Sequence, residues 1–335
     1  DLVAVAGREH GRPLGEIDWR LQHNRPDSLG LISEPILDVH SLELPLRLKD
    51  LGVTIVFSAL PSGPAQKIEQ HLTKSGFVVF SNASAYRMHP EVPLVVADVN
   101  PEALEKWPGE LGRLACATNC TLIPVLHPLH IIAKHHVVKH VKVRSEQALS
   151  GAGWTLLFDD EKRKLAIGNE IEGEAQKLIE EAERILHLGA EWDVVCRRVD
   201  ETEGHIVNVE LEVEANVTIE EINSLLQKNN YSHLSKLPSA PTTPLIVLEE
   251  PPTRDVHLWG SSHSSNPDPS QDLLAGMETC VYVEMVEGTT IKFKALSHNT
   301  IRGAAGGVVL LAERAIAEGH IPSVDINPSD VSSDW

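Results

Sequence analysis

The feature that most constrains the fold is a strand–helix–strand pattern in the first quarter of the chain. Val53–Leu60 is a continuous run of mostly apolar residues, as expected for a strand buried on both faces of a parallel sheet. A turn at Pro61–Pro64 leads into helical periodicity over Ala65–Ser75, and Phe77–Ser81 has the composition of a second strand. This spacing predicts a βαβ unit and therefore a parallel sheet covered by helices.

Short apolar runs on either side extend the predicted parallel sheet. We expect strands at Asp1–Ala6, Pro93–Ala97 and Leu114–Ala117. The first of these runs is followed by Gly7–Arg12, a basic loop that contains glycine. Because the strands alternate with helical patterns, the N-terminal part is predicted to be an α/β layer.

The middle of the chain has a different character. Alternating polar and apolar residues predict strands with one solvated face at Val137–Val143, Ile206–Glu214, Val281–Glu284 and Ile291–Lys294. Amphipathic helices are expected at Glu170–Leu188 and Thr218–Lys228, a surface excursion rich in proline and serine at Leu237–Pro269, and a final helix at Thr300–Gly319. The small residues Gly303–Gly307 indicate close packing at the start of that last helix. We therefore predict an α+β second domain with a largely antiparallel sheet.

Size and charge exclude several kinds of partner. The chain has 335 residues, of which 42% are hydrophobic, and this length is sufficient for two domains. A formal net charge of −19 repels phosphodiester backbones and anionic lipid, so neither nucleic acid nor membrane is an expected partner. No apolar run reaches the roughly 20 residues of a membrane span, and we find no secretory signal or transit peptide. The four cysteines form no CxxC pair, which indicates reduced thiols and a cytoplasmic location.

Cys120 is the first candidate catalytic residue. The predicted strand at Leu114–Ala117 and a helical pattern opened by Pro124, with Thr121 as a cap, place this cysteine in a strand-to-helix turn. A helix N-terminus favours the thiolate, which is the nucleophilic form of cysteine. The preceding Asn119 offers an amide donor for an oxyanion. The alternative is a small buried hydrophobic residue, which is the commoner role of a free cysteine.

Other polar residues allow both a functional and an ordinary interpretation. Gln147–Gly153 follows a strand, and its small residues permit close approach of the backbone, but the same pattern is typical of a turn. Arg198 and His205 are separated by an acidic loop, where the histidine is either a base or a surface residue. Glu174 and Lys177 are three residues apart on a helix, as in a solvated ion pair.

The seventeen histidines invite a metal-binding interpretation. They include His127 and His130 on the helix after Cys120, and a cluster that contains His140. Neither an HExxH motif nor a zinc-finger spacing is present, so no metal ligand is predicted, and a histidine–metal protein remains the weakest alternative.

Taken together, several motifs resemble one family. They are Ser81–Met88, Val92–Val96, Asn119–Thr121, Gln147–Gly153, Gly173–Lys177, Cys196–His205, Leu237–Pro241 and Leu296–Gly307. In their order and spacing over nearly the whole chain they resemble aspartate-semialdehyde dehydrogenase of the archaeal and fungal type. The resemblance implies a Rossmann-like NADP-binding domain formed by residues 1–118 and 298–335, and a catalytic and dimerisation domain formed by residues 119–297.

The resemblance also implies a reaction, in which L-aspartate 4-semialdehyde, phosphate and NADP⁺ interconvert with 4-phospho-L-aspartate and NADPH. It implies that Cys120 is the nucleophile, that His205 is the general acid and base, and that the enzyme is a homodimer or homotetramer. It further implies that Asn119 and Gln147 position the substrate and the oxyanion, that Arg198 binds the substrate carboxylate, and that Glu174 binds its amino group. The residues implied to bind phosphate are Lys177 and Arg87. The residues implied to bind NADP are Arg8, Ser62, Ser150, Gly151 and Asn299. Arg198, Lys177 and Arg87 would thus bind two anions, the substrate carboxylate and phosphate, although the protein as a whole is acidic.

The sequence departs from the family pattern at identifiable positions. The family's first strand and its GATGxVG phosphate-binding loop are not found, and the chain starts at the family's expected second strand. Ala6 replaces a usual serine, Val207 replaces a glutamate, and Val281–Met285 replaces an arginine-containing motif. A related acyl reductase, such as a malonyl-CoA reductase, and a non-catalytic homologue without the phosphate loop are therefore kept as alternatives.

Overall fold

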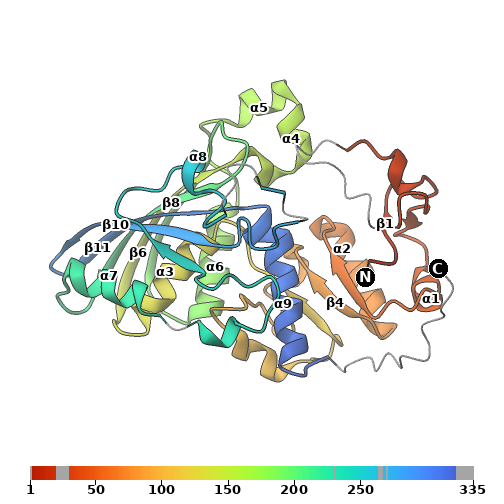
Figure 1. Cartoon of the computed structure of the whole chain (residues 1–335), viewed down its shortest axis with the longest axis horizontal. Helices are drawn as coiled ribbons and strands as arrows, with labels where there is room; N and C mark the ends of the chain where they lie inside the picture. Colours follow the sequence, from red (N-terminus) through yellow and green to blue (C-terminus); the bar gives the residue numbers. More distant parts are fainter. Residues whose placement is uncertain (1, 20–29, 230, 263–266, 269–270, 322–335) are drawn as a thin grey trace.

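In the described part of the chain, two main sheets lie side by side, with helix α9 (Gly306–Ala317) between them (Figure 1). The computed structural model describes residues 2–19, 30–229, 231–262, 267–268 and 271–321. One sheet is parallel and small, and the other is mixed and has six strands. This arrangement confirms the predicted fold class, a Rossmann-like α/β layer next to an α+β domain with a largely antiparallel sheet.

The predicted βαβ unit forms the parallel sheet. Its strands are β3 (Ile55–Ser58), β4 (Val78–Ser81) and β5 (Leu114–Cys116), in that order, and α2 (Ser62–Lys74) and α9 pack against β4. The prediction that the first strand is buried on both faces is wrong. Among the described residues β3 is an edge strand, so that 49% of the Phe57 surface is exposed. The turn predicted at Pro61–Pro64 is instead the start of α2, with Pro61 as its N-cap.

Two other predicted strands are shorter than expected or absent. Of the run Asp1–Ala6, Asp1 lies outside the described residues and only Ala6 enters a strand, β1 (Ala6–Gly7), which pairs with β2 (Leu37–Asp38). The predicted strand at Pro93–Ala97 has a single bridge, from Leu94 to Cys116. An apolar run becomes a strand only where a neighbouring backbone offers hydrogen bonds along its length. Among the described residues, the first segment bonds to β2 only near its end, through the Val5 carbonyl, and the second bonds only to Cys116, through Pro93 and Val95.

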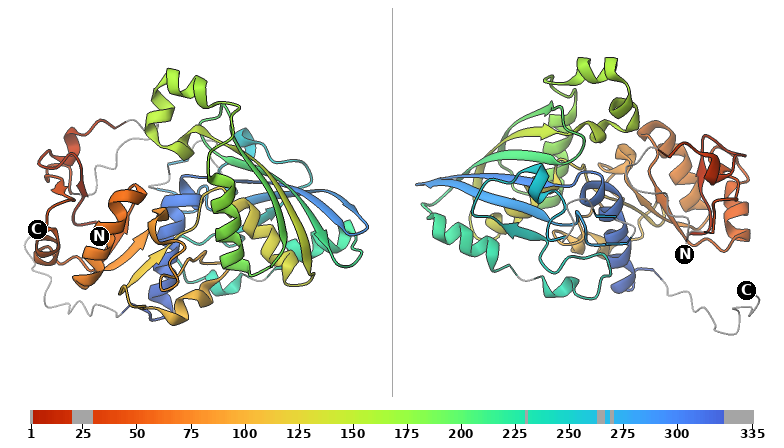
Figure 2. Two further views of the ribbon diagram at one scale, coloured as in Figure 1. Left: turned by 180° about the vertical axis from the view of Figure 1, so that it is seen from behind. Right: turned by 45° about the horizontal axis from the view of Figure 1, so that its top comes forward.

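The second sheet contains all the alternating segments predicted for the middle of the chain. Its strand order is β7-β6-β8-β11-β10-β9, with antiparallel pairs in the centre and a parallel pair at each edge. The strands are β6 (Val138–Gln147), β7 (Glu191–Arg198), β8 (His205–Val213), β9 (Leu245–Val247), β10 (Thr279–Glu287) and β11 (Thr290–Ser297). Helices α3 (Ile123–Ala133), α6 (Glu174–Leu186) and α7 (Ile219–Gln227) pack on it, and Figure 2 shows α3 and α6 on the same side.

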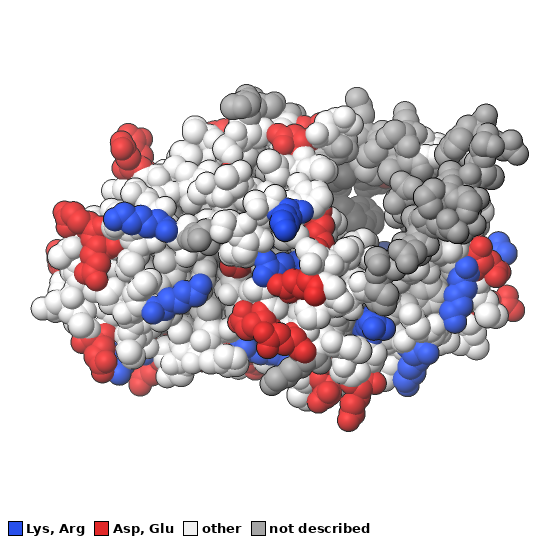
Figure 3. Space-filling model, turned by 60° about the horizontal axis from the view of Figure 1, so that its bottom comes forward, with Lys and Arg blue, Asp and Glu red and all other residues white. Residues whose placement is uncertain are grey.

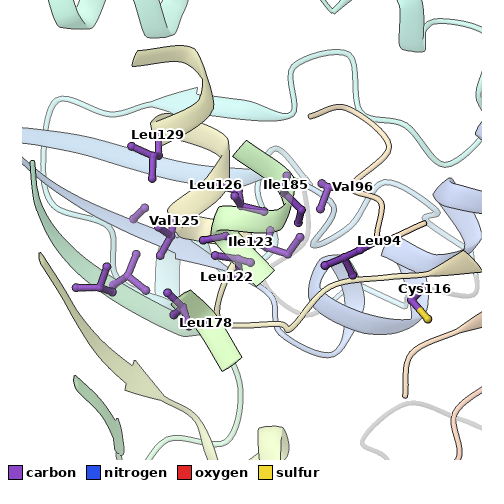
Figure 4. Close-up of a cluster of buried hydrophobic side chains, with 14 of the residues drawn as sticks. Leu94, Val96, Cys116, Leu122, Ile123, Val125, Leu126, Leu129, Leu178 and Ile185 are labelled. Atoms are coloured by element: carbon purple, nitrogen blue, oxygen red, sulfur yellow. The ribbon is translucent and has the colours of Figure 1, made fainter. Parts of the chain in front are cut away.

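The main core fills the space between this sheet and its helices. Figure 4 shows Leu126 and Leu129 of α3 and Leu178 and Ile185 of α6, which belong to one buried cluster. The same cluster continues to Leu94 and other residues beside the parallel sheet. Because one continuous core joins both sheets, residues at their facing ends are held at fixed distances from each other.

The remaining segments connect these layers. Helices α1 (Leu44–Asp50), α4 (Trp154–Phe158), α5 (Asp160–Ala166) and α8 (Arg254–His257) are short, and α4 and α5 project from the molecule at the top of Figure 1. Short 3₁₀ turns occur at Leu14–Glu16, Ser84–Tyr86, Pro101–Lys106, Leu149–Ala152 and Ser232–Leu234. The segment predicted as a surface excursion contributes the edge strand β9 and buries Leu237 and Leu245, so that description is only partly correct; residues 263–266 and 269 lie outside the described part.

The C-terminal helix is preceded by an irregular turn. A π-helical segment at Ile301–Ala305 leads directly into α9. On the face shown in Figure 3, acidic and basic side chains are interspersed and form no continuous basic area. Within the described residues, no helix is both long and apolar enough to cross a membrane.

Candidate active site

Three strand ends bring the predicted catalytic and substrate-binding residues of the second domain together. Gln147 is the last residue of β6 and pairs in register with Arg198, the last residue of β7. His205 is the first residue of β8, on the other side of β6, and pairs with Ser297 of β11. All three side chains therefore lie at one edge of the six-stranded sheet, although 58 positions separate Gln147 from His205 in the chain.

Cys120 reaches the same edge from the parallel sheet. It lies in the turn between β5 and α3, and its Sγ atom is 3.4 Å from Nε2 of His205. Thr121 does not cap α3, because the helix begins two residues later and its N-cap is Leu122. Instead Oδ1 of Asn119 accepts a hydrogen bond from the Thr121 backbone N–H at 2.7 Å, which fixes the turn that carries the thiol.

The thiol and the imidazole are both neutral in this arrangement. Burial, reinforced by the Glu174 carboxylate, raises the pKa of the Cys120 thiol to about 11. Burial also lowers the pKa of His205 to about 3, and the nearby guanidinium groups of Arg198 and Arg254 act in the same direction. The direction of this shift is opposite to the predicted stabilisation of a thiolate by a helix N-terminus, because loss of water disfavours the charged form.

The hydrogen bonds of His205 define which nitrogen carries its proton. The backbone N–H of Ala148 donates to Nδ1 at 3.1 Å, so in the neutral ring Nδ1 is an acceptor and the proton lies on Nε2. Nε2 is the nitrogen that faces Cys120. The imidazole is thus oriented as a hydrogen-bond donor toward the sulfur and toward any oxygen that approaches it.

A group of amide and carboxylate side chains lies beside this pair. Nδ2 of Asn119 donates to Oε1 of Glu174 at 2.8 Å, and Nε2 of Gln147 lies 3.4 Å from the same oxygen. The other carboxylate oxygen of Glu174 is 4.0 Å from Nζ of Lys177, at the exposed end of the group. The two residues that the sequence also allowed to be a solvated ion pair are therefore part of the site.

The two arginines predicted to bind anions are in different environments. Arg198 is buried and donates from Nη1 to the Ala148 carbonyl at 2.6 Å. Among the residues that the structure describes, no carboxylate is within ion-pair distance of its guanidinium. Arg87 is also buried, but it is already paired with Glu181 at 3.0 Å and donates to the carbonyl of Asn82. An incoming anion thus meets an unpaired cation at Arg198 and a shared one at Arg87.

Sequence reasoning missed Glu181. This glutamate is buried on α6 between the core residues Leu178 and Ile185, and it binds both Arg87 and the backbone next to Cys120. A signal was present, because Glu181 occupies an apolar position of an otherwise amphipathic helix, where an acidic residue needs a partner.

The residues predicted to bind the cofactor lie in two places. Nδ2 of Asn299 donates to Oγ of Ser150 at 2.8 Å, and its Oδ1 accepts from the Gly204 N–H at 2.8 Å, directly before His205. A Cβ atom on Gly151 would lie 3.0 Å from atoms of Arg198 and His205, so the backbone here approaches the reacting groups closely. Through His205, this turn of the backbone lies next to Cys120.

The second place is the carboxyl end of β3. Helix α2 begins there at Ser62 and has no side-chain cap, so its first N–H groups are available for a phosphate. The exposed Arg8 follows β1. Among the described residues, no group of three or more histidine, cysteine, aspartate or glutamate side chains is arranged to hold a metal ion.

The fold and the site define a class of protein, a dinucleotide-dependent dehydrogenase. A family model described as semialdehyde dehydrogenase, NAD binding domain, matches residues 39–107. The aspartate-semialdehyde dehydrogenase of Archaeoglobus fulgidus is 34% identical over 94% of this chain and 90% of its own length, and that of Aspergillus fumigatus is 35% identical over 80% and 78%. The chain therefore belongs to the aspartate-semialdehyde dehydrogenase family, as the motifs indicated.

Two further comparisons concern the fold and a related enzyme with a different substrate. The solved structure of aspartate semialdehyde dehydrogenase with NADP from Candida albicans has a TM-score of 0.75 and 24% identity, and it covers 96% of this chain and 92% of the other. It shows that the fold is shared. A malonyl CoA reductase (NADP) of Metallosphaera sedula is 29% identical over 93% of this chain and 88% of its own length.

Proposed function

We propose that the protein catalyses the reversible, phosphate-dependent conversion of L-aspartate 4-semialdehyde and NADP⁺ into 4-phospho-L-aspartate and NADPH. The observation that carries the proposal is the 3.4 Å approach of Cys120 Sγ to His205 Nε2 in a chain of this family. The Arg198 guanidinium lies beside this pair and, among the described residues, has no carboxylate at ion-pair distance. The reaction supplies an intermediate for the synthesis of lysine, threonine and methionine.

Substrate binding uses the charges at the edge of the six-stranded sheet. Arg198 has donors left for the α-carboxylate, and its planar guanidinium favours a bidentate pair. Glu174 receives the substrate ammonium group on the same side as Asn119 and Gln147. An amino acid with a short side chain then presents its aldehyde to Cys120.

Attack of the Cys120 sulfur on the aldehyde is coupled to a proton exchange at His205. Nε2 delivers its proton to the carbonyl oxygen and takes the thiol proton as Sγ bonds to the carbon, which gives a neutral thiohemiacetal. The amide of Asn119 lies one residue before the sulfur and helps to orient the oxygen.

When bound, NADP⁺ supplies the hydride acceptor, held by Ser150, Gly151 and Asn299 beside the sulfur and by Arg8 and the N-terminus of α2 at its phosphates. The thiohemiacetal would give its hydride to the bound cofactor and its hydroxyl proton to water, because Nε2 of His205 already carries a proton, which it donates as a hydrogen bond to the new carbonyl oxygen; a thioester remains on Cys120. Phosphate, held by Lys177 and Arg87, then attacks the acyl carbon as the carbon–sulfur bond breaks. The phosphate proton passes to the departing sulfur, which restores the Cys120 thiol, and the acyl phosphate is released.

The test is reduction of NADP⁺ with aspartate semialdehyde, with and without phosphate. We expect activity that requires phosphate and that is lost in Cys120→Ala, whereas Cys280→Ala, which replaces another buried thiol, retains it. Reduction of malonyl-CoA in preference to the aspartyl substrate would assign the chain to the reductase type instead. Absence of NADP⁺ binding by calorimetry would indicate a non-catalytic homologue.

The proposal extends to assembly and location. We place the nucleotide domain at residues 1–118 and 298–335 and the catalytic domain at residues 119–297, although residues 322–335 lie outside the described part. The six-stranded sheet carries helices on one face, which leaves its other face for a partner subunit in a homodimer or homotetramer. A cytoplasmic location agrees with four free cysteines.

A further inference from the structure

Glu181 is a buried carboxylate that is shared by two parts of the site. Oε1 accepts a hydrogen bond from Nη1 of Arg87 at 3.0 Å. Oε2 accepts from Oγ1 of Thr118 at 2.7 Å and from the backbone N–H of Asn119 at 2.7 Å. The side chain is 3% exposed, and with three donors and one full positive charge around it the carboxylate is paired in the way that burial of a charge requires.

We propose that Glu181 is a positioning residue that couples the phosphate-binding cation Arg87 to the loop that carries Cys120, and that it restrains the affinity of Arg87 for phosphate. The inference rests on the proposed function for the identity of the anion. Its structural basis is that one carboxylate contacts both the guanidinium and the amide immediately before the nucleophile.

Helix α6 makes this coupling rigid. Glu174, Lys177, Glu181 and Arg184 follow one another at intervals of three and four residues, and therefore lie along one side of the helix. Arg184 donates to the backbone carbonyl of Arg87 at 2.6 Å and to that of Val92 at 2.7 Å. Both the guanidinium and the backbone of Arg87 are thus fixed by the same helix that carries Glu174 into the site.

The arrangement has two opposing consequences for the reaction. The negative charge of Glu181 partly offsets the positive charge of Arg87 and repels an incoming phosphate, so phosphate binds more weakly than it would to a free guanidinium. The same charge holds the Thr118–Asn119 backbone, and through it the position of Cys120 relative to His205. Removal of the charge should therefore tighten phosphate binding and slow the chemical step, a combination that simple loss of stability does not produce.

The variant Glu181→Gln separates these effects. The amide has one carbonyl oxygen, which can accept hydrogen bonds from Arg87 or from the Thr118–Asn119 donors, but not from both. Its NH₂ group then faces a donor at the other position. We expect the KM for phosphate to fall roughly three- to tenfold and kcat to fall by up to about 10²-fold, the size of loss typical of a misplaced reacting group. The matched control is Glu180→Gln, the same change on the exposed side of α6, which should leave both constants unchanged.

A second measurement does not depend on turnover. Phosphate bound beside Cys120 should slow alkylation of this thiol by iodoacetamide, and the concentration dependence gives a dissociation constant. We expect this constant to fall in Glu181→Gln, and the difference to vanish when Arg87→Gln is also present, because the restraint acts through Arg87.

The outcomes are distinguishable. An unchanged or weaker phosphate affinity in Glu181→Gln, with activity lost only in proportion to the folded fraction, would overturn the coupling. The coupling would also be overturned if phosphate did not protect Cys120 from alkylation in the wild-type protein. If phosphate protects Cys120 and Glu181→Gln tightens it, but the wild type reduces no NADP⁺ with aspartate semialdehyde, then the coupling stands and the proposed function fails.

Discussion

At the scale of single residues, the protonation of Cys120 and His205 distinguishes this site from one with a preformed thiolate. A thiol whose pKa is raised to about 11 faces an imidazole whose pKa is lowered to about 3, and the Ala148 N–H holds the imidazole proton on the side of the sulfur. An imidazolium–thiolate pair would require the opposite shifts. The nucleophile is therefore generated during substrate addition.

The first prediction concerns alkylation of Cys120 as a function of pH. Because the thiolate is the reactive form, the rate with iodoacetamide should rise about tenfold per pH unit between pH 6 and 9, toward a midpoint near 11. The measurement is the labelled fraction of the peptide that contains Cys120, followed by mass spectrometry. A rate that is constant from pH 5 to 8 would instead indicate a preformed ion pair and would contradict the neutral assignment.

At the scale of elements, the π-helical turn that precedes α9 fits against the nucleophile. A Cβ atom on Gly303 would lie 2.7 Å from Cβ and 3.0 Å from Cα of Cys120, which leaves no room for a side chain. The sequence indicated close packing of Gly303–Gly307 at a helix start, and the structure identifies Cys120, the proposed nucleophile, as one of the neighbours. π-helical turns of this kind are frequent at functional sites.

The second prediction follows from this contact. Gly303→Ala should lower kcat by about 10²-fold, because either Cys120 or the π-helical turn has to shift while the sulfur needs its position relative to His205. Ala305→Ser is a suitable control, since residue 305 is exposed in the same turn. Steady-state kinetics and a crystal structure of the variant would test it. Full activity would show that Cys120 tolerates the displacement.

The sequence predicts an element well when the residues of that element alone carry the pattern. The βαβ unit, the alternating strands and helix α6 follow from periodicity within each segment. The short extent of β1 and the exposed face of β3 depend on which strands lie next to them, and a single sequence does not contain this information. Arg198 and His205 appeared as loop residues seven positions apart, and only the strand order β7-β6-β8 places both beside Gln147. Glu181 carried a visible signal, but its partners are supplied by other elements.

At the scale of the whole molecule, a buried charge network joins the two sheets. Asp98, from the parallel-sheet side, pairs with Arg302 of the π-helical turn and lies 3.2 Å from Nε2 of His127 on α3. Nδ1 of His127 in turn contacts Oγ1 of Thr279 on β10 at 2.7 Å. Despite its burial, Asp98 has a pKa held well below its usual range, because Arg302 and His127 stabilise the charged carboxylate.

The last prediction is that Asp98→Asn destabilises the fold by about 3–5 kcal/mol, since the Arg302 guanidinium would remain buried without its counter-charge. The folded-state pKa of Asp98 is depressed, so the ionised carboxylate stabilises the fold fully above its unfolded pKa of about 4. This stabilisation is lost as the pH falls from there toward the folded value. Urea unfolding at pH 7 and at pH 3 should therefore show a smaller gap between wild type and variant at the lower pH. The exposed Asp50→Asn serves as control and should change the free energy of unfolding by less than about 0.5 kcal/mol. A gap that widens on acidification would show that Asp98 is not the charged centre of the network.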